Sequence, residues 1–90
     1  MTSWTFLTNH AQVFLCIARN PRATAREVAA VVGITERAVQ RIIADLEEAE
    51  YITRHREGRN NIYKLNPNRP MRHPAQHNHA VQDLLREFLD

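Results

Sequence analysis

The chain has 90 residues and a mass of 10.5 kDa, which allows one compact domain and excludes a second independent core. Hydrophobic residues make up 43% and charged residues 24%, a composition typical of a soluble globular chain and unlike that of a disordered or membrane protein. The formal net charge is only +2, so the total charge alone does not indicate a polyanionic partner.

The sequence shows no membrane segment and no signal peptide. Polar residues interrupt every apolar run well before the roughly 20 residues that a membrane span needs. The first seven residues have neither a basic stretch nor an apolar core. We therefore expect a cytoplasmic protein, in which the single Cys16 forms no internal disulfide.

Charge is distributed unevenly along the chain. Residues 51–76 carry six basic residues against one acid, whereas residues 27–50 carry two arginines against six acids. The small net charge therefore conceals a strongly basic segment that follows an acidic one.

The first half predicts three helices. The first covers Asn9 to Arg19, with Asn9 as its cap, and ends at Asn20-Pro21. The second starts at the capping box Thr24-Ala-Arg-Glu27 and runs to about Val32, before a turn at Gly33.

The third predicted helix covers residues 35–49 and is capped by Thr35. Its apolar stripe should face the core and comprises Ala38, Val39, Ile42, Ile43, Leu46 and Ala49. The acids Asp45, Glu47, Glu48 and Glu50 follow on its distal turns.

Two strands are expected next, over residues 51–56 and 61–65, with a tip at Glu57-Gly-Arg-Asn60. Three prolines between residues 66 and 79 predict an irregular connector. A short terminal helix then carries an apolar stripe at helical spacing, formed by Val81, Leu84, Leu85, Phe88 and Leu89.

Two helices joined by Gly33-Ile34-Thr35 and followed by a basic hairpin resemble the winged helix-turn-helix of bacterial transcription regulators. The segment from Arg56 to Leu65 looks like the wing of ArsR-type regulators. Trp4 to Ala11 and Gly33 to Arg41 are similar to small bacterial winged-helix proteins near MarR and ArsR. The resemblance covers residues 4–89 and implies a mainly α, α+β fold that binds DNA. The wing lacks the Asp-x-Arg pattern of MarR proteins.

The third helix should then enter the major groove, with its first turns nearest the bases. The candidate residues are Thr35, Glu36, Arg37, Gln40 and Arg41. Arginine suits guanine, glutamine suits adenine and glutamate suits cytosine, so Arg37 and Gln40 are the first candidates for base contacts. The distal acids are expected to point away from the DNA.

The wing, residues 52–65, should contact the DNA backbone and the minor groove, with Arg59 at its tip. The candidates there and beside the second helix are Arg22, Arg26, Arg54, Arg56, Arg59, Asn60 and Lys64.

The terminal stripe has no evident partner within the chain, so it predicts a homodimer that reads a palindromic operator. The candidate interface residues are Trp4, Phe6, Leu7, Val81, Leu84, Leu85, Phe88 and Leu89. Residues 1–66 would form the DNA-binding domain, and residues 67–90 the connector and dimerisation helix.

Two other functions stay open. The domain can be a protein-interaction module whose basic wing binds an acidic partner, or a metal- or redox-responsive regulator that uses His73, His77, His79 or Cys16. The histidines lie in a Pro-interrupted segment, which is poorly suited to a fixed zinc geometry. With no catalytic triad and no phosphate-binding glycine loop, we predict no enzymatic activity, no metal and no cofactor.

Overall fold

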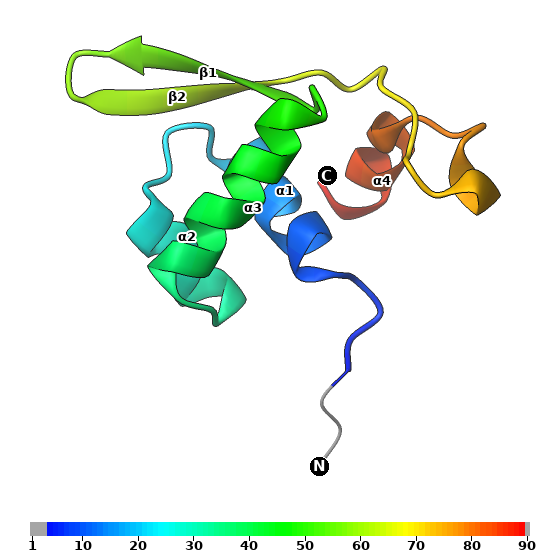
Figure 1. Ribbon diagram of the computed structural model, residues 1–90, viewed down its shortest axis with the longest axis horizontal. Coiled ribbons are helices and arrows are strands. Elements are labelled where there is room, and N and C mark those ends of the chain that lie inside the picture. The colour runs from blue at the N-terminus through cyan, green and yellow to red at the C-terminus, as the bar shows by residue number, and fades with distance from the viewer. Residues whose placement is uncertain (1–3, 90) are drawn as a thin grey trace.

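The computed structural model describes residues 4–89. It contains four α-helices, a two-stranded sheet and a 3₁₀ turn (Figure 1). In chain order these are α1 (Asn9–Arg19), α2 (Ala25–Val32), α3 (Glu36–Glu48), β1 (Ile52–Glu57), β2 (Asn60–Leu65), η1 (Pro74–Gln76) and α4 (Val81–Phe88). The α+β winged-helix fold expected from the sequence is confirmed. Over these residues, no helix is long and apolar enough to cross a membrane.

The core lies where α1, α2 and α3 pack together. Val13 and Ile17 on α1, Val28 on α2 and Val39 on α3 are at most 1% exposed. The hairpin adds Ile52 and the ring of Tyr63, and no buried polar residue occurs among residues 4–89. The apolar faces predicted for the first three helices therefore meet in one core.

The start of α1 differs from the prediction in its cap. The hydroxyl of Thr8 accepts a hydrogen bond from the N–H of Ala11 at 3.1 Å, so Thr8 caps the helix and Asn9 is its first residue. Thr8 has the extended backbone that a cap residue needs, at φ −67° and ψ 164°.

Strands β1 and β2 form an antiparallel hairpin in which Ile52 pairs with Leu65 and Glu57 with Asn60. The turn therefore contains only Gly58 and Arg59, which is shorter than the predicted tip. Gly58 has φ +62°, a left-handed conformation that glycine adopts without steric cost.

The junction between α3 and the hairpin has an unusual backbone. Glu50 has φ 66°, and it is the only non-glycine residue with positive φ between residues 4 and 89. The side-chain amide of Asn66 donates to the Glu50 carbonyl at 2.7 Å, and the buried Tyr51 donates its hydroxyl to the Pro70 carbonyl at 2.6 Å. These bonds join the end of α3, the end of β2 and the connector.

The connector and α4 are more closely attached to the body than the sequence indicated. Val81 is 8% exposed and belongs to the main core, and Leu85 packs against that core. The expectation that the terminal stripe has no partner within the chain is therefore wrong for these two residues. The guanidinium of Arg19 also donates to the Phe88 carbonyl at 2.9 Å, which ties the end of α4 to α1.

The N-terminal segment before α1 extends away from the body (Figure 1). Trp4 and Phe6 on this arm are 64% and 92% exposed, and their rings make an edge-to-face contact with centroids 5.2 Å apart. Neither aromatic residue takes part in the core.

Candidate nucleic-acid interface

The positions of α2 and α3 follow from local interactions at their ends. The Thr24 hydroxyl accepts from the Glu27 N–H at 3.1 Å, and the Glu27 carboxylate accepts from the Thr24 N–H at 2.8 Å. Gly33 has φ +83°, and its N–H donates to the Ala29 carbonyl at 2.8 Å. The predicted capping box and left-handed turn are therefore both confirmed, and they set where α3 begins.

Helix α3 is held from one side only. Thr35 accepts from the Ala38 N–H at 3.1 Å and caps the helix, as predicted. Val39, Ile42, Ile43 and Leu46 are buried. The five residues predicted to face the major groove are all exposed, namely Thr35, Glu36, Arg37, Gln40 and Arg41. The buried apolar side therefore fixes α3 in place, and its polar side is exposed to solvent.

The hairpin is attached to the helices by main-chain and side-chain contacts. The N–H of Tyr63 donates to the Pro21 carbonyl at 3.0 Å, which joins β2 to the loop before α2. Arg54 Nη2 on β1 also lies 3.2 Å from Glu47 Oε1 on α3. These two contacts hold the wing beside α2 and α3, whereas the 3.4 Å hydrogen bond from Arg56 Nε to the Gly58 carbonyl lies within the hairpin.

The two faces of the hairpin divide the predicted wing residues. Arg54 pairs with Tyr63 and Arg56 with Asn61, so these four share the face that Tyr63 directs towards the body. Lys64 belongs to the opposite face. The structure therefore does not bring Lys64 together with Arg54 and Arg56.

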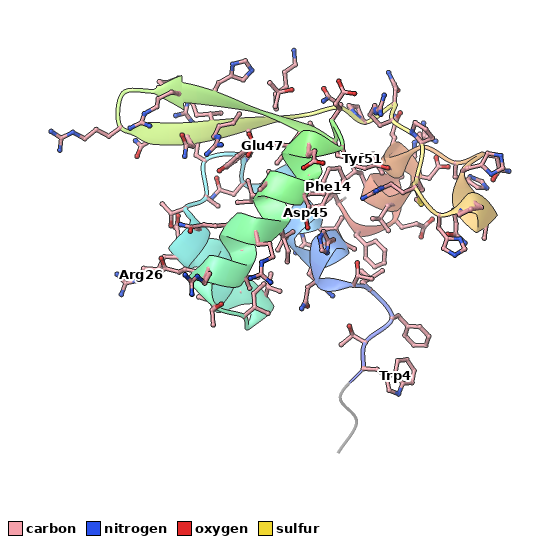
Figure 2. The ribbon with its side chains drawn as sticks, viewed as in Figure 1. Trp4, Phe14, Arg26, Asp45, Glu47 and Tyr51 are labelled. Atoms are coloured by element: carbon pink, nitrogen blue, oxygen red, sulfur yellow. The ribbon has the colours of Figure 1, made fainter. Side chains whose placement is uncertain are left out.

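A groove of about 400 Å³ runs between the start of α2, the middle of α3 and the hairpin. It brings together five of the predicted residues, which are Arg22, Gln40, Arg54, Arg59 and Asn60. Arg26, Arg37 and Arg41 lie outside its lining, and Figure 2 shows Arg26 extending from α2 into solvent. Asn61 and Thr24 also line the groove, although neither was predicted to be a site residue. The alternation of strand side chains, which places Asn61 on the face of Arg54, was the signal that could have found it.

Two of the predicted arginines in the groove form ion pairs. Arg22 Nη1 lies 3.2 Å from Glu57 Oε1, and Arg54 Nη2 lies 3.2 Å from Glu47 Oε1. Both pairs connect the hairpin to a helix or to the loop before one. Over residues 4–89, Arg37, Arg41 and Arg59 form no ion pair. Arg22, Glu57 and Arg54 are exposed and Glu47 is half-buried, so each pair lies at the surface and contributes little to stability.

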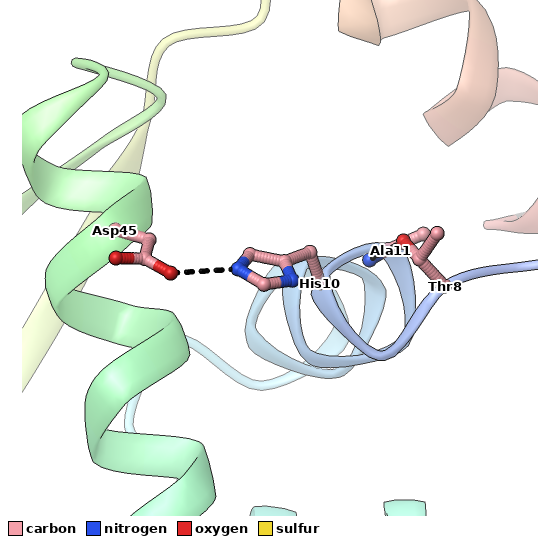
Figure 3. A network of polar contacts seen from close by, with 4 residues as sticks. All are labelled: Thr8, His10, Ala11 and Asp45. Carbon is pink, nitrogen blue, oxygen red and sulfur yellow. Dashed lines mark hydrogen bonds and ion pairs between the residues drawn. The ribbon is translucent and has the colours of Figure 1, made fainter.

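The acids at the end of α3 behave differently from the expectation. Glu47 lines the same groove as Gln40 and Arg54, rather than lying away from the candidate interface. Asp45 does lie on another side, where its Oδ2 is 2.8 Å from His10 Nε2 on α1 (Figure 3). The two residues are two positions apart, which places them on nearly opposite sides of the helix.

Three groups among residues 4–89 have a pKa that departs from its ordinary value. Hydrogen bonding to the Thr24 N–H, and then to its hydroxyl, lowers the pKa of Glu27. Burial raises the pKa of the Cys16 thiol and of the Tyr63 hydroxyl. A cysteine thiol with a raised pKa is a poorer nucleophile at neutral pH, which does not favour a redox role for Cys16.

The histidines proposed for metal binding are engaged locally. His73 Nδ1 accepts from the Ala75 N–H at 3.0 Å, and His77 Nδ1 lies 2.6 Å from the Pro74 carbonyl. His79 Nδ1 lies 2.8 Å from the Asp83 carboxylate. The part of the chain that the structure describes contains no group of three or more side chains that could hold a metal ion.

Comparison with known proteins agrees with the observed fold. A family model described as winged helix-turn-helix DNA-binding matches residues 9–53, which is half of the chain. The matched region runs from the start of α1 into β1 and includes all of α2 and α3. A search of curated proteins finds no match.

Proposed function

Because the chain belongs to the winged helix-turn-helix DNA-binding family, we propose that it is a sequence-specific regulator of transcription that binds DNA as a homodimer. The observation that carries this proposal is the polar face of α3. Its side chains are exposed at the start of the helix, and a buried apolar stripe on the other side fixes the helix. The basic hairpin beside it completes a surface suited to duplex DNA.

In this proposal the first turns of α3 enter the major groove. Arg37 would donate two hydrogen bonds to guanine, and Gln40 would pair with adenine. Glu36 can accept from the amino group of cytosine. These side chains are exposed and close together on one helix, which supports a direct reading of bases.

Other residues would bind the phosphate backbone and fix the orientation of the domain. The Thr35 hydroxyl and the guanidinium of Arg41 lie beside the base-reading residues, and Arg22 and Arg26 lie near the start of α2. On the wing, Arg59 would enter the minor groove, with Arg54, Arg56 and Asn60 on the adjacent backbone. Lys64 is on the opposite face of the hairpin and would make at most a peripheral phosphate contact.

Binding by Arg54 and Arg22 requires an exchange of partners. Each guanidinium is 3.2 Å from a carboxylate in the free protein, so a phosphate would replace Glu47 or Glu57. Since exposed pairs contribute about 0 to 1 kcal/mol, this exchange costs little compared with phosphate binding.

The homodimer would place two copies of α3 about 34 to 36 Å apart, so that they read a palindromic operator. The surfaces available to a second copy are those left at least partly uncovered in the single chain, and they include Leu84 and Phe88 on α4 and Leu89 directly after it. Val81 is buried within its own chain and does not contribute. The likeness of the wing to that of ArsR-type regulators supports this arrangement.

Titration of the protein with a generic DNA duplex at about 50 and 200 mM salt tests the proposal. Affinity should fall steeply, with a slope of about −0.9 for each phosphate contact. Selection of bound duplexes from a random pool should then return a consensus with two-fold symmetry. If the protein fails to bind DNA even at the lower salt, the proposal is wrong, and the basic wing would instead indicate an acidic protein partner.

A further inference from the structure

A second groove lies on a part of the surface that the proposed DNA contacts do not use. It has a volume of about 520 Å³ and is formed by α1, α2 and the last turn of α4. Its apolar lining includes Leu15, Cys16, Val31, Val32 and Phe88. Neither α3 nor the hairpin contributes to it, and none of the residues proposed to bind DNA lines it. An occupant of this groove would leave the DNA-binding surface free.

The groove is apolar and uncovered. Val31 is 75% exposed and Phe88 is 44% exposed, although both are large hydrophobic residues. Exposed apolar residues are ordinary when they are scattered, but here they line one concave surface. Polar side chains, among them Gln12 and Arg19, also line it. An apolar floor with polar groups beside it is typical of a site for protein side chains.

The N-terminal arm carries the complementary group. Trp4 and Phe6 are the other two large hydrophobic residues exposed in residues 4–89, and their rings contact each other. Leu7, directly after them, already lines the groove, so the arm leaves the body at the groove itself. Figure 2 shows Trp4 directed away from the chain's own helices.

We propose that the groove of each chain receives the Trp4–Phe6 arm of a second copy, and that this reciprocal exchange is the homodimer interface. The inference rests on the proposed function for the existence of a dimer, and it adds the location of the interface and the residues that form it. An exchange of this kind has two-fold symmetry, because each chain supplies one arm and one groove.

The area available agrees with a dimer. A buried aromatic side chain removes about 150 to 250 Å² from solvent, so the four rings of two arms would bury about 600 to 1,000 Å². The two grooves that they cover add a smaller area. The total therefore reaches the lower end of the range for a standard stable interface, about 1,200 Å².

Disulfide cross-linking tests which groove the arm occupies. Cys16 is the chain's single cysteine and lines the groove, so a Phe6→Cys variant provides a second thiol on the arm. An added oxidant such as copper phenanthroline would remove two electrons and two protons from the thiol pair and form one S–S bond. We expect a covalent dimer on a non-reducing gel, because the thiols must approach closely to join.

The matched control is Phe6→Cys combined with Cys16→Ser, which should abolish the cross-link. A dimer that persists in this control would show that arm meets arm and would overturn the proposal. An intramolecular disulfide would show that the arm occupies its own groove, and two free thiols would show that it occupies neither. Both outcomes would also overturn the proposal.

A second measurement uses sedimentation of variants that should keep their fold. Trp4→Ser with Phe6→Ser, or Val31→Glu alone, should raise the dimer dissociation constant at least about 30-fold, which corresponds to the loss of one interfacial hot spot. Ala30→Glu is the matched control, since Ala30 is also exposed on α2 but does not line the groove. Unchanged dimerisation in both the arm variant and the Val31→Glu variant would place the interface elsewhere and overturn the proposal.

These experiments contain no DNA, so they separate the two proposals. A cross-linked dimer that does not bind DNA would contradict the proposed function and support the interface. A chain that binds DNA without the cross-link would do the opposite.

Discussion

Helices α3 and α4 are both amphipathic, yet the chain uses them differently. α3 has 13 residues, a threonine cap and four buried apolar side chains. α4 has eight residues and no side-chain cap, and Val81 is its one buried residue. Both helices carry an apolar stripe, so the stripe alone does not distinguish a helix fixed in the core from one that is partly covered.

The two helices therefore present two different kinds of surface to solvent. On α3 the apolar side is buried, which leaves a polar face for a ligand, with Arg37 and Arg41 in its first turns. On α4 the apolar side is covered at Val81 and Leu85 and remains exposed at Phe88. We infer that α3 is suited to bind a charged partner, and that the end of α4 belongs to an apolar surface suited to another protein.

The largest effect should come from the cores of the two helices. Ile42→Ala should lower the free energy of unfolding by about 2 to 5 kcal/mol, because Ile42 is 5% exposed. Leu84→Ala on α4 should cost about 1 kcal/mol, since that side chain is only partly buried. Urea unfolding of both variants measures the difference. Equal losses would mean that α4 is as firmly packed as α3.

The exposed faces should differ next. Arg37→Ala should weaken DNA binding by about 1 to 3 kcal/mol and relax sequence preference, because it removes a proposed base contact. Arg59→Ala should weaken binding to all sequences alike, as expected for a wing contact. Arg86→Ala is the control, since Arg86 is an exposed arginine on α4 that lies 3.6 Å from Asp83. Electrophoretic mobility shifts with matched and mismatched operators would measure all three, and a similar loss in the Arg86 variant would contradict the assignment of the binding face to α3.

The helix caps should give a smaller and opposite pair of effects. Thr35→Ala removes the hydrogen bond to the Ala38 N–H and should cost about 0.5 to 2 kcal/mol. Ala80→Ser should stabilise α4 by about 1 kcal/mol, because Ala80 already has an extended backbone at φ −80° and ψ 156°. Thermal unfolding tests both, and a destabilised Ala80 variant would show that the start of α4 cannot accept a cap.

The smallest effect should be the pH dependence of the helix that precedes α3. The pKa of Glu27 is lowered in the folded chain from its ordinary value of 4.5, so its ionised form stabilises the fold above that pH. This contribution is lost as the pH falls through the folded-state pKa. The difference in melting temperature between wild type and Glu27→Ala should therefore shrink from pH 7 to pH 3. A constant difference would mean that ionisation of Glu27 does not support α2.

Most of the helix-turn-helix could be predicted from the sequence because its determinants are local. Thr24 and Glu27 are three residues apart, Gly33 follows the last helical residue, and Thr35 precedes α3. Each signal acts within one or two turns of backbone. The same locality explains why the exposed side of α3 was correctly identified.

The features that were missed depend on contacts between distant segments. Glu47 meets Arg54 across the junction with the hairpin, and Val81 joins a core built mainly from residues before position 53. No periodicity within one element carries this information.

The left-handed backbone at Glu50 helps to set the distance between the two parts of the surface proposed to bind DNA, α3 and the hairpin. It is the point where the chain leaves α3 and turns into the hairpin, and Asn66 and Tyr51 hold it from two sides. The separation between Arg37 and Arg59 is therefore set by this short junction, together with the hydrogen bond from the Tyr63 N–H to the Pro21 carbonyl, and not by a flexible linker. In the proposed complex these two residues enter neighbouring grooves, so their fixed separation would make affinity depend on the distance between those grooves. A change in groove width would then alter the affinity even at base pairs that no side chain contacts.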